Sequence, residues 1–251
     1  MTWVYFLRKK SDATEAFKQF LADVRADGVP STVEIVRSDG GGEFSFDGSF
    51  GDLCRDRGIK QEFTCPDSPE MNGIAERALG LMEASAMAAR FQAEEIFAGI
   101  PLPISDRLWA ESMRWACDCL NRIATTGNRD NKSAYEMWYG KTAVLQLLPF
   151  LKPGFCRRKR VHKLEPKAQE CFYLGPSTNH PRDAMRVLTK GRIVVTTRNV
   201  TWRRISGLKR RHLVFGRVEG SQDDEDADDF EITRSGGGHE SRGASGEADD
   251  G

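Results

Sequence analysis

Apolar residues in the first part of the chain follow two spacings, one typical of strands and one typical of helices. β-Branched, aromatic or alternating runs predict strands over residues 2–7, 32–36 and 59–65. Apolar residues that recur every three or four positions predict helices over residues 12–24, 50–57, 68–92 and 104–124. Strands that alternate with helices predict an α/β sheet layered with helices.

The pattern changes after residues 152–154 (KPG). Short β runs follow at 171–174, 184–188, 192–197 and 199–202, which predicts a small β-barrel or meander. From about residue 221 the chain is rich in acidic residues, glycine and serine, which predicts disorder. We therefore expect three parts, at residues 1–145, 146–205 and 206–251.

The net charge of zero conceals three blocks of different charge. Residues 1–151 carry 17 basic and 22 acidic side chains, and residues 218–251 carry 2 basic and 12 acidic ones. Residues 152–217 carry 18 basic and only 3 acidic side chains, a net charge of +15. A block this basic predicts a surface that binds a polyanion.

Other features of the composition exclude some classes of protein. No apolar run approaches the ~20 residues of a membrane span, and the N-terminus lacks the pattern of a secretory signal. Six cysteines include no C-x-x-C pair, and the four histidines are scattered. We interpret the cysteines as reduced and intracellular, rather than as a disulfide framework or a zinc site.

Two carboxylates stand where a divalent-metal site could form. Asp39 ends the β-branched run that begins with the predicted strand at residues 32–36, and it precedes three glycines. Glu76 lies on a later long helix, with 36 residues between the two acids. Oxygen ligands of this kind hold Mg²⁺, and two metal ions ~4 Å apart can clamp the attacking and leaving oxygens in phosphoryl transfer. Each acid alone has a simpler explanation, because Asp-Gly favours turns and a glutamate on a helix is usually solvated.

The surrounding residues resemble those of a known family. RSDGGGEF (37–44) and SPEMNGIAER (68–77) resemble the second and third acidic motifs of retroviral-type integrases, and the closest branch is the copia-type retrotransposon integrases. SAYEMWYGK (133–141) is similar to the end of the copia catalytic core. KLEPKAQECFYLG (163–175) and RNVTW (198–202) are similar to the β-rich module that follows that core.

The resemblance implies a ribonuclease-H-like core, a mixed sheet with helices on both faces, followed by a small basic β-rich module. It implies an Asp-Asp-Glu triad that binds two Mg²⁺ or Mn²⁺ ions, trims the 3′ ends of the element DNA and joins them to target DNA. Asp39 and Glu76 match two of the three catalytic, metal-binding carboxylates. Asn72 and Gly73 match the family's pair that faces DNA, and Arg77 matches a basic neighbour that contacts phosphate.

The sequence departs from the family in three ways. The family's first Asp lies on a strand upstream of the one matched by residues 2–7, so it is missing from this chain, as is the His/Cys zinc module. Gly40 replaces the usual Asn after the motif Asp. We therefore expect an N-terminally truncated integrase with little or no activity, poorly soluble alone because residues 2–7 would form an exposed edge strand. The alternative is a decayed or co-opted transposon protein that binds nucleic acid without catalysis.

The basic block at residues 152–217 is predicted to bind DNA. Phosphate contacts are predicted for a cluster at the start of the β-rich module: Arg157, Arg158, Lys159, Arg160 and Lys163. A nuclear-localisation cluster or a solvated surface is the simpler alternative. The expected partners are the element ends and target DNA, together with further copies of the chain, in the nucleus after passage through a cytoplasmic particle. The acidic tail either competes for the basic block or links to the next polyprotein segment.

Overall fold

The structure is a computed structural model, and it describes residues 1–29, 32–65, 72–143, 147–158, 160, 162–177, 180 and 183–204. The described residues all belong to one compact unit, Met1–Leu213. The predicted tail at 206–251 lies outside the described residues. The predicted boundary at residues 145–146 also falls on residues outside that part, so the three-part division stays a prediction.

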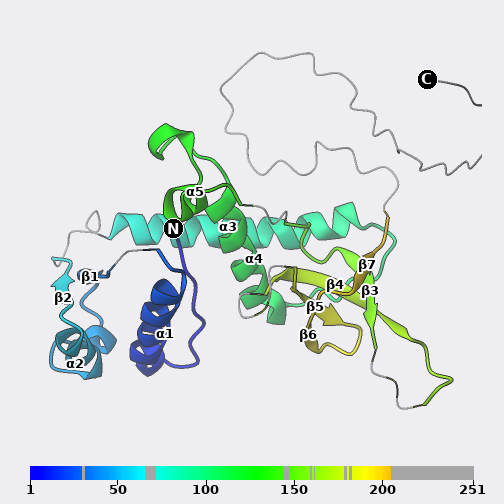
Figure 1. Ribbon diagram of the computed structural model, residues 1–251, viewed down its shortest axis with the longest axis horizontal. Coiled ribbons are helices and arrows are strands. Elements are labelled where there is room, and N and C mark those ends of the chain that lie inside the picture. Colours follow the sequence, from blue (N-terminus) through cyan, green and yellow to red (C-terminus); the bar gives the residue numbers. More distant parts are fainter. Residues whose placement is uncertain are drawn as a thin grey trace, which may run out of the picture. The chain divides into compact units, whose positions relative to one another are not determined.

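The N-terminal half is a mixed α/β arrangement (Figure 1). Helix α1 (Ala13–Ala26) precedes strand β1 (Ile35–Ser38), helix α2 (Ser49–Asp56) and strand β2 (Lys60–Phe63). Short 3₁₀ turns lie at η1 (Lys10–Asp12) and η2 (Gly42–Phe44). β1 and β2 pair in parallel with Ile35 opposite Lys60, so the connection through α2 is a βαβ unit. These strands and helices agree with the elements that the sequence predicts.

The prediction of a strand over residues 2–7 is wrong in this structure. The segment has no strand partner among the described residues, where β1 and β2 form a sheet of two strands. Its side chains instead pack on helices: Trp3 meets Phe20 and Trp138 edge to face, and Phe6 meets Trp109. A β-prone segment becomes a strand only where another strand supplies its backbone hydrogen bonds. The predicted mixed core sheet is thus represented by two parallel strands.

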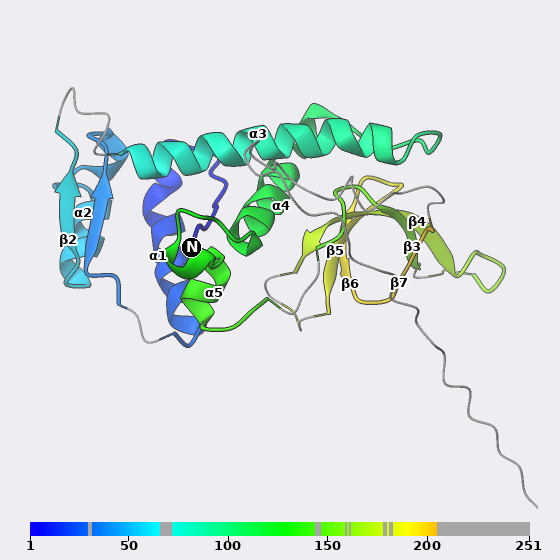
Figure 2. The same ribbon diagram turned by 90° about the horizontal axis from the view of Figure 1, so that it is seen from above.

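Three further helices follow. Helix α3 (Gly73–Ile96) packs against helix α4 (Trp109–Arg122), which crosses it at an angle in both Figures 1 and 2. Helix α5 (Ala134–Tyr139) contacts α4, and the 3₁₀ turns η4 (Asp106–Leu108) and η5 (Arg129–Asn131) lie in the connections. α3 presents small side chains to α4, since Ala86, Ala89 and Ala93 are buried. No helix in the described part of the chain is long and apolar enough to cross a membrane.

The C-terminal described region is an antiparallel sheet of five strands in the order β6-β5-β4-β3-β7. Its strands are β3 (Pro153–Arg157), β4 (Ala168–Pro176), β5 (Met185–Thr189), β6 (Val194–Thr197) and β7 (Val200–Trp202). One face of the sheet buries Cys156, Cys171 and Val187, against which Trp202 packs. The predicted small β module is therefore present. Strand β3 has no counterpart among the strands predicted from the sequence.

The sheet is attached to the helices through α4. Arg186 on β5 donates to both carboxylate oxygens of Glu111 on α4, at 2.7 Å to Oε1. Trp115 on α4 donates its indole N–H to the backbone carbonyl of Leu148 at 2.9 Å. Phe150 and Leu151 lie buried beside this contact. The basic loop between β3 and β4 is thus carried by a sheet anchored on the helical part.

Candidate catalytic and nucleic-acid-binding site

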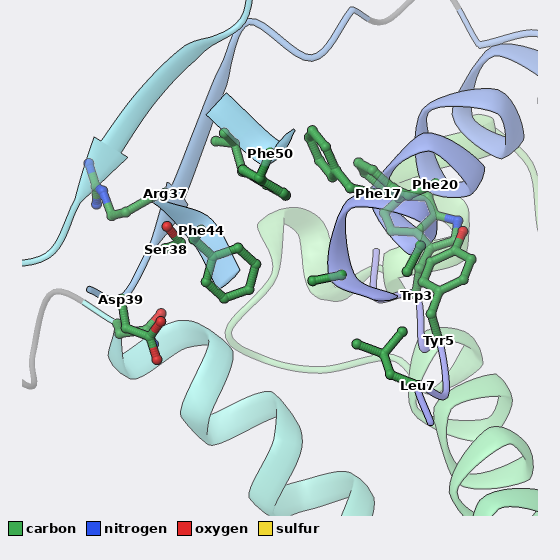
Figure 3. A pocket seen from close by; sticks show the side chains of 14 residues that line it. Trp3, Tyr5, Leu7, Phe17, Phe20, Arg37, Ser38, Asp39, Phe44 and Phe50 are labelled. Atoms are coloured by element: carbon green, nitrogen blue, oxygen red, sulfur yellow. The ribbon is translucent and has the colours of Figure 1, made fainter. Parts of the chain in front are cut away.

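An apolar cavity of about 480 Å³ lies among residues 2–7, α1 and β1. Aromatic rings form most of its wall, and Figure 3 shows them facing the cavity from several elements. The rings are those of Trp3, Tyr5, Phe17, Phe20, Phe44 and Phe50. Polar side chains at the carboxyl end of β1 and at the start of α3 complete the lining: Arg37, Ser38, Asp39 and Asn72.

Asp39 directly follows β1, where the sequence places it. Its Oδ1 atom accepts a hydrogen bond from the backbone N–H of Gly41 at 3.2 Å, the local turn contact expected of Asp before glycine. The side chain is exposed. The adjacent Ser38 hydroxyl is buried, and it makes no hydrogen bond within the described residues.

The second motif lies at the beginning of α3. Asn72 is the residue before the helix, and its carbonyl accepts from the N–H groups of Ala75 and Glu76 at 3.0 and 3.1 Å. Gly73 is the first helical residue, and Glu76 and Arg77 lie exposed in the first turn. The structure therefore brings Asp39 and Asn72 to one cavity and places Glu76 one turn beyond Asn72 (Figure 3).

Glu43 is a nearby acid for which the sequence predicts no role. A Cβ atom on Gly41 would lie 3.0 Å from Oδ1 of Asp39 and 2.9 Å from Oε2 of Glu43, so both carboxylates face this glycine. Lys10 approaches Glu43 at 3.9 Å. The motif itself held the signal, because Asp39 and Glu43 flank three glycines in which a turn can bring two acids together.

The carboxylates of this region have the right chemistry to bind a divalent metal ion, but too few of them lie together in the described part of the chain. Asp39 and Glu76 offer carboxylate oxygens, the ligands that Mg²⁺ and Mn²⁺ prefer. Among the described residues, however, no group of three His, Cys, Asp or Glu side chains lies close enough together to hold a metal ion. The described residues therefore do not form a complete metal site.

Tyr5 lies in the aromatic wall of the cavity, and its hydroxyl makes a hydrogen bond. The hydroxyl donates to Oδ2 of Asp23 at 2.7 Å. Burial first, and then this carboxylate, raises the pKa of Tyr5 far above its usual value. This hydrogen bond holds the extended segment on α1.

The predicted phosphate-binding residues lie at the end of β3 and in the loop that leads to β4. Arg157, Arg158, Arg160 and Lys163 are all exposed. Two of them have local contacts, since Arg158 lies 3.8 Å from Glu165 and Arg160 donates to the Lys163 carbonyl at 2.9 Å. Lys159 lies outside the described residues. We call Arg157, Arg158, Arg160 and Lys163 the basic loop cluster.

Comparison with known proteins agrees with the predicted resemblance. The chain is 28% identical over 183 residues to the "Retrovirus-related Pol polyprotein from transposon TNT 1-94" of Nicotiana tabacum. The match covers 69% of this chain and 12% of that polyprotein. No protein-family model matches the sequence.

One solved structure is also similar. It is the cryo-EM structure of the simian T-cell lymphotropic virus intasome in complex with the PP2A regulatory subunit B56 gamma. The identity is 12%, with 81% of this chain and 68% of that chain covered, and the TM-score is 0.38. A TM-score of this size does not establish a shared fold.

Proposed function

We propose, because this chain is related to the Pol polyprotein of a retrovirus-related transposon, that it acts in DNA integration as part of an integrase and binds DNA through its basic sheet module. The relative is much longer than this chain, so the proposal concerns the segment they share. A ribonuclease-H-like core is part of the proposal. The parallel pair β1 and β2, joined through α2, supports it.

One observation carries this proposal. Asp39 and Asn72 come from two motifs that are far apart in the sequence, and both line the same cavity. Glu76 lies one turn further along α3, on the helix that Asn72 begins. Two unrelated surface motifs would not be expected to meet at one cavity.

The chain's own residues have separate roles in this proposal. Asp39 and Glu76 would hold Mg²⁺ or Mn²⁺, which supplies charge stabilisation in phosphoryl transfer when it is bound. The exposed N-terminal turn of α3, with Gly73 and Arg77, would lie against the DNA backbone. Gly73 has no side chain to obstruct this approach, and a Cβ atom there would meet nothing within 4 Å.

A second candidate is DNA binding without catalysis. The observation that favours it is the incomplete metal site in the described part of the chain. The two candidates share DNA binding, with element ends and target DNA as ligands and other copies of the chain as partners. Both place the protein in the nucleus. They differ only in whether this chain performs the chemistry.

Equilibrium DNA binding tests the part that both candidates share. We expect replacement of the basic loop cluster (Arg157, Arg158, Arg160 and Lys163) by alanine to weaken binding of a labelled duplex at least tenfold, measured by fluorescence anisotropy. The matched control removes the same charge from exposed residues elsewhere, namely Arg8, Lys9, Arg57 and Arg129. Equal losses in the two variants would contradict a binding surface at the cluster.

A further inference from the structure

One face of the five-stranded sheet is buried at one end of strand β3 and open at the other. Pro153, Phe155 and Arg157 lie on this face, because side chains two residues apart in a strand point the same way. Pro153 is buried, and so is Phe172, which lies opposite it on β4. Phe155 is 41% exposed, and Arg157 beyond it is also exposed. The sheet therefore presents an aromatic ring to solvent where this face opens.

Basic side chains lie next to the Phe155 ring. Strand β7 runs beside β3 (Figure 1), and Thr201 on β7 is opposite Phe155. Arg203 follows β7, and its guanidinium carbon lies 5.9 Å from the centre of the Phe155 ring. This distance is close to the outer limit of a cation–π contact, so the guanidinium approaches the ring and leaves it open to solvent. Arg157 is the next residue of β3 on this face, and the basic loop cluster begins with it.

The charge around the ring is positive, although an acid lies beside it. Glu170 on β4 is opposite Phe155 and is half-buried. Lys190, which is exposed, donates its backbone N–H to the Glu170 carbonyl at 3.3 Å. Arg157 and Arg203 are exposed as well, so three exposed cations accompany one half-buried carboxylate. This part of the sheet is therefore complementary to an anionic partner that also offers a flat apolar surface.

We propose that this open part of the sheet binds unpaired nucleotides of single-stranded DNA, with a base stacked on Phe155 and phosphates held by Arg157 and Arg203. Every base has a π face that an aromatic ring can stack on, and the phosphates of the strand require cations nearby. The inference rests on the proposed DNA binding and adds to it a preference for unpaired over paired DNA. The chain would then hold a strand end whose bases have been separated from their partners.

The aromatic ring gives this surface a selectivity that the basic loop cluster lacks. Lysine and arginine contact the phosphates of single and double strands alike, so the cluster alone does not discriminate between them. In a duplex each base is already stacked on its neighbours and paired, and its π face is not available to a protein ring. Phe155 therefore contributes to the binding of an unpaired base and adds little to the binding of a duplex.

Fluorescence anisotropy of the full chain tests this preference, with a labelled single strand of about 10 nucleotides and a duplex of the same length. Phe155→Leu keeps an apolar side chain but removes the aromatic ring. We expect it to weaken single-strand binding about fivefold or more and to leave duplex binding unchanged. Phe155→Trp keeps a ring, so it should bind the single strand at least as tightly as the wild type. Circular dichroism checks that each variant is folded.

Phe46 provides a matched control. It is 53% exposed, and the guanidinium carbon of Arg55 lies 4.9 Å from the centre of its ring. Like Phe155, it is therefore an exposed phenylalanine beside an arginine, but it belongs to residues 1–151, where acidic side chains outnumber basic ones. Phe46→Leu should leave the binding of both DNA forms unchanged. Equal losses of single-strand binding in Phe46→Leu and Phe155→Leu would overturn the assignment to Phe155.

A fluorescent base reports the stacking itself. The emission of 2-aminopurine falls when it stacks on an aromatic ring, so a single strand that carries it should lose fluorescence on the wild type and much less on Phe155→Leu. Single-strand binding and quenching that Phe155→Leu leaves unchanged would overturn this inference, even where duplex binding still depends on the basic loop cluster. Absence of binding to either DNA form at low salt would overturn the proposed function as well.

Discussion

At the scale of single residues, the motifs indicated which side chains would matter, and the packing determined how they are surrounded. The resemblance assigned Asp39 to the metal site and Asn72 to the DNA-facing start of a helix, and both residues line one cavity. The approach of Glu43 toward Asp39 was not predicted, because it depends on how the three-glycine turn folds. On α4, Trp109 is 53% exposed, whereas Trp115 is buried.

The carboxylates of Asp39 and Glu76 give a prediction for catalysis. We expect the isolated chain to show no strand transfer above background with Mg²⁺ or Mn²⁺, because Asp39 and Glu76 supply two of the three acids that the resemblance implies. Metal charge contributes several kcal/mol of transition-state stabilisation in such reactions. Incubation with a labelled element-end duplex and target DNA, resolved on a denaturing gel, measures the product. Robust turnover that Asp39→Asn abolishes would contradict the prediction.

Gly51 gives a prediction for stability near the cavity. A Cβ atom at this position would lie 1.9 Å from the carbonyl oxygen of Phe46, a backbone atom that cannot move without shifting η2 and α2. We expect Gly51→Ala to lower the free energy of unfolding by about 3 kcal/mol or more. Gly48→Ala is the control, since its Cβ would meet Ser45 at an ordinary 3.5 Å. Urea denaturation of both variants provides the comparison, and similar losses would contradict the explanation.

At the scale of elements, periodicity predicted the helices and strands that have local signals. The helices predicted at residues 50–57 and 104–124 correspond to α2 and α4, and the strands predicted near residues 32–36 and 59–65 correspond to β1 and β2. Residues 2–7 have the composition of a strand but no partner strand in the described structure, and no pattern within six residues reveals that. β3 was not predicted, because its sequence, PGFCR, contains Pro and Gly, which are depleted in strands.

Helix α5 gives a prediction for pH dependence. Glu136 accepts hydrogen bonds from the backbone N–H and the hydroxyl of Ser133 and from Thr142, which lower its pKa below its usual value. A carboxylate whose folded pKa is lowered adds stability above its unfolded pKa of about 4.5, and that stability is lost as pH falls through the folded pKa. We expect Glu136→Gln to reduce the loss of stability below pH 4.5, measured by urea denaturation across a pH series. An unchanged pH profile would contradict this role.

At the scale of the whole molecule, the distribution of charge along the chain, rather than the total charge, indicates where the proposed DNA-binding surface lies. The net charge is zero, yet residues 152–217 carry a net charge of +15. Within this block the exposed basic loop cluster lies on a five-stranded sheet whose β5 strand is tied to α4 through Arg186 and Glu111. That attachment could not be predicted, because it joins residues 75 positions apart in two regions with different patterns.

The most direct test of DNA binding is its dependence on salt. Each phosphate that a basic side chain neutralises releases counterions, so the logarithm of the binding constant falls with the logarithm of salt concentration by about 0.9 per contact. If the basic loop cluster contacts four phosphates, the slope for the wild-type chain on a short duplex should be about −3.6 or steeper. A binding constant that does not change with salt concentration, or no binding at low salt, would contradict the claim that this chain binds DNA.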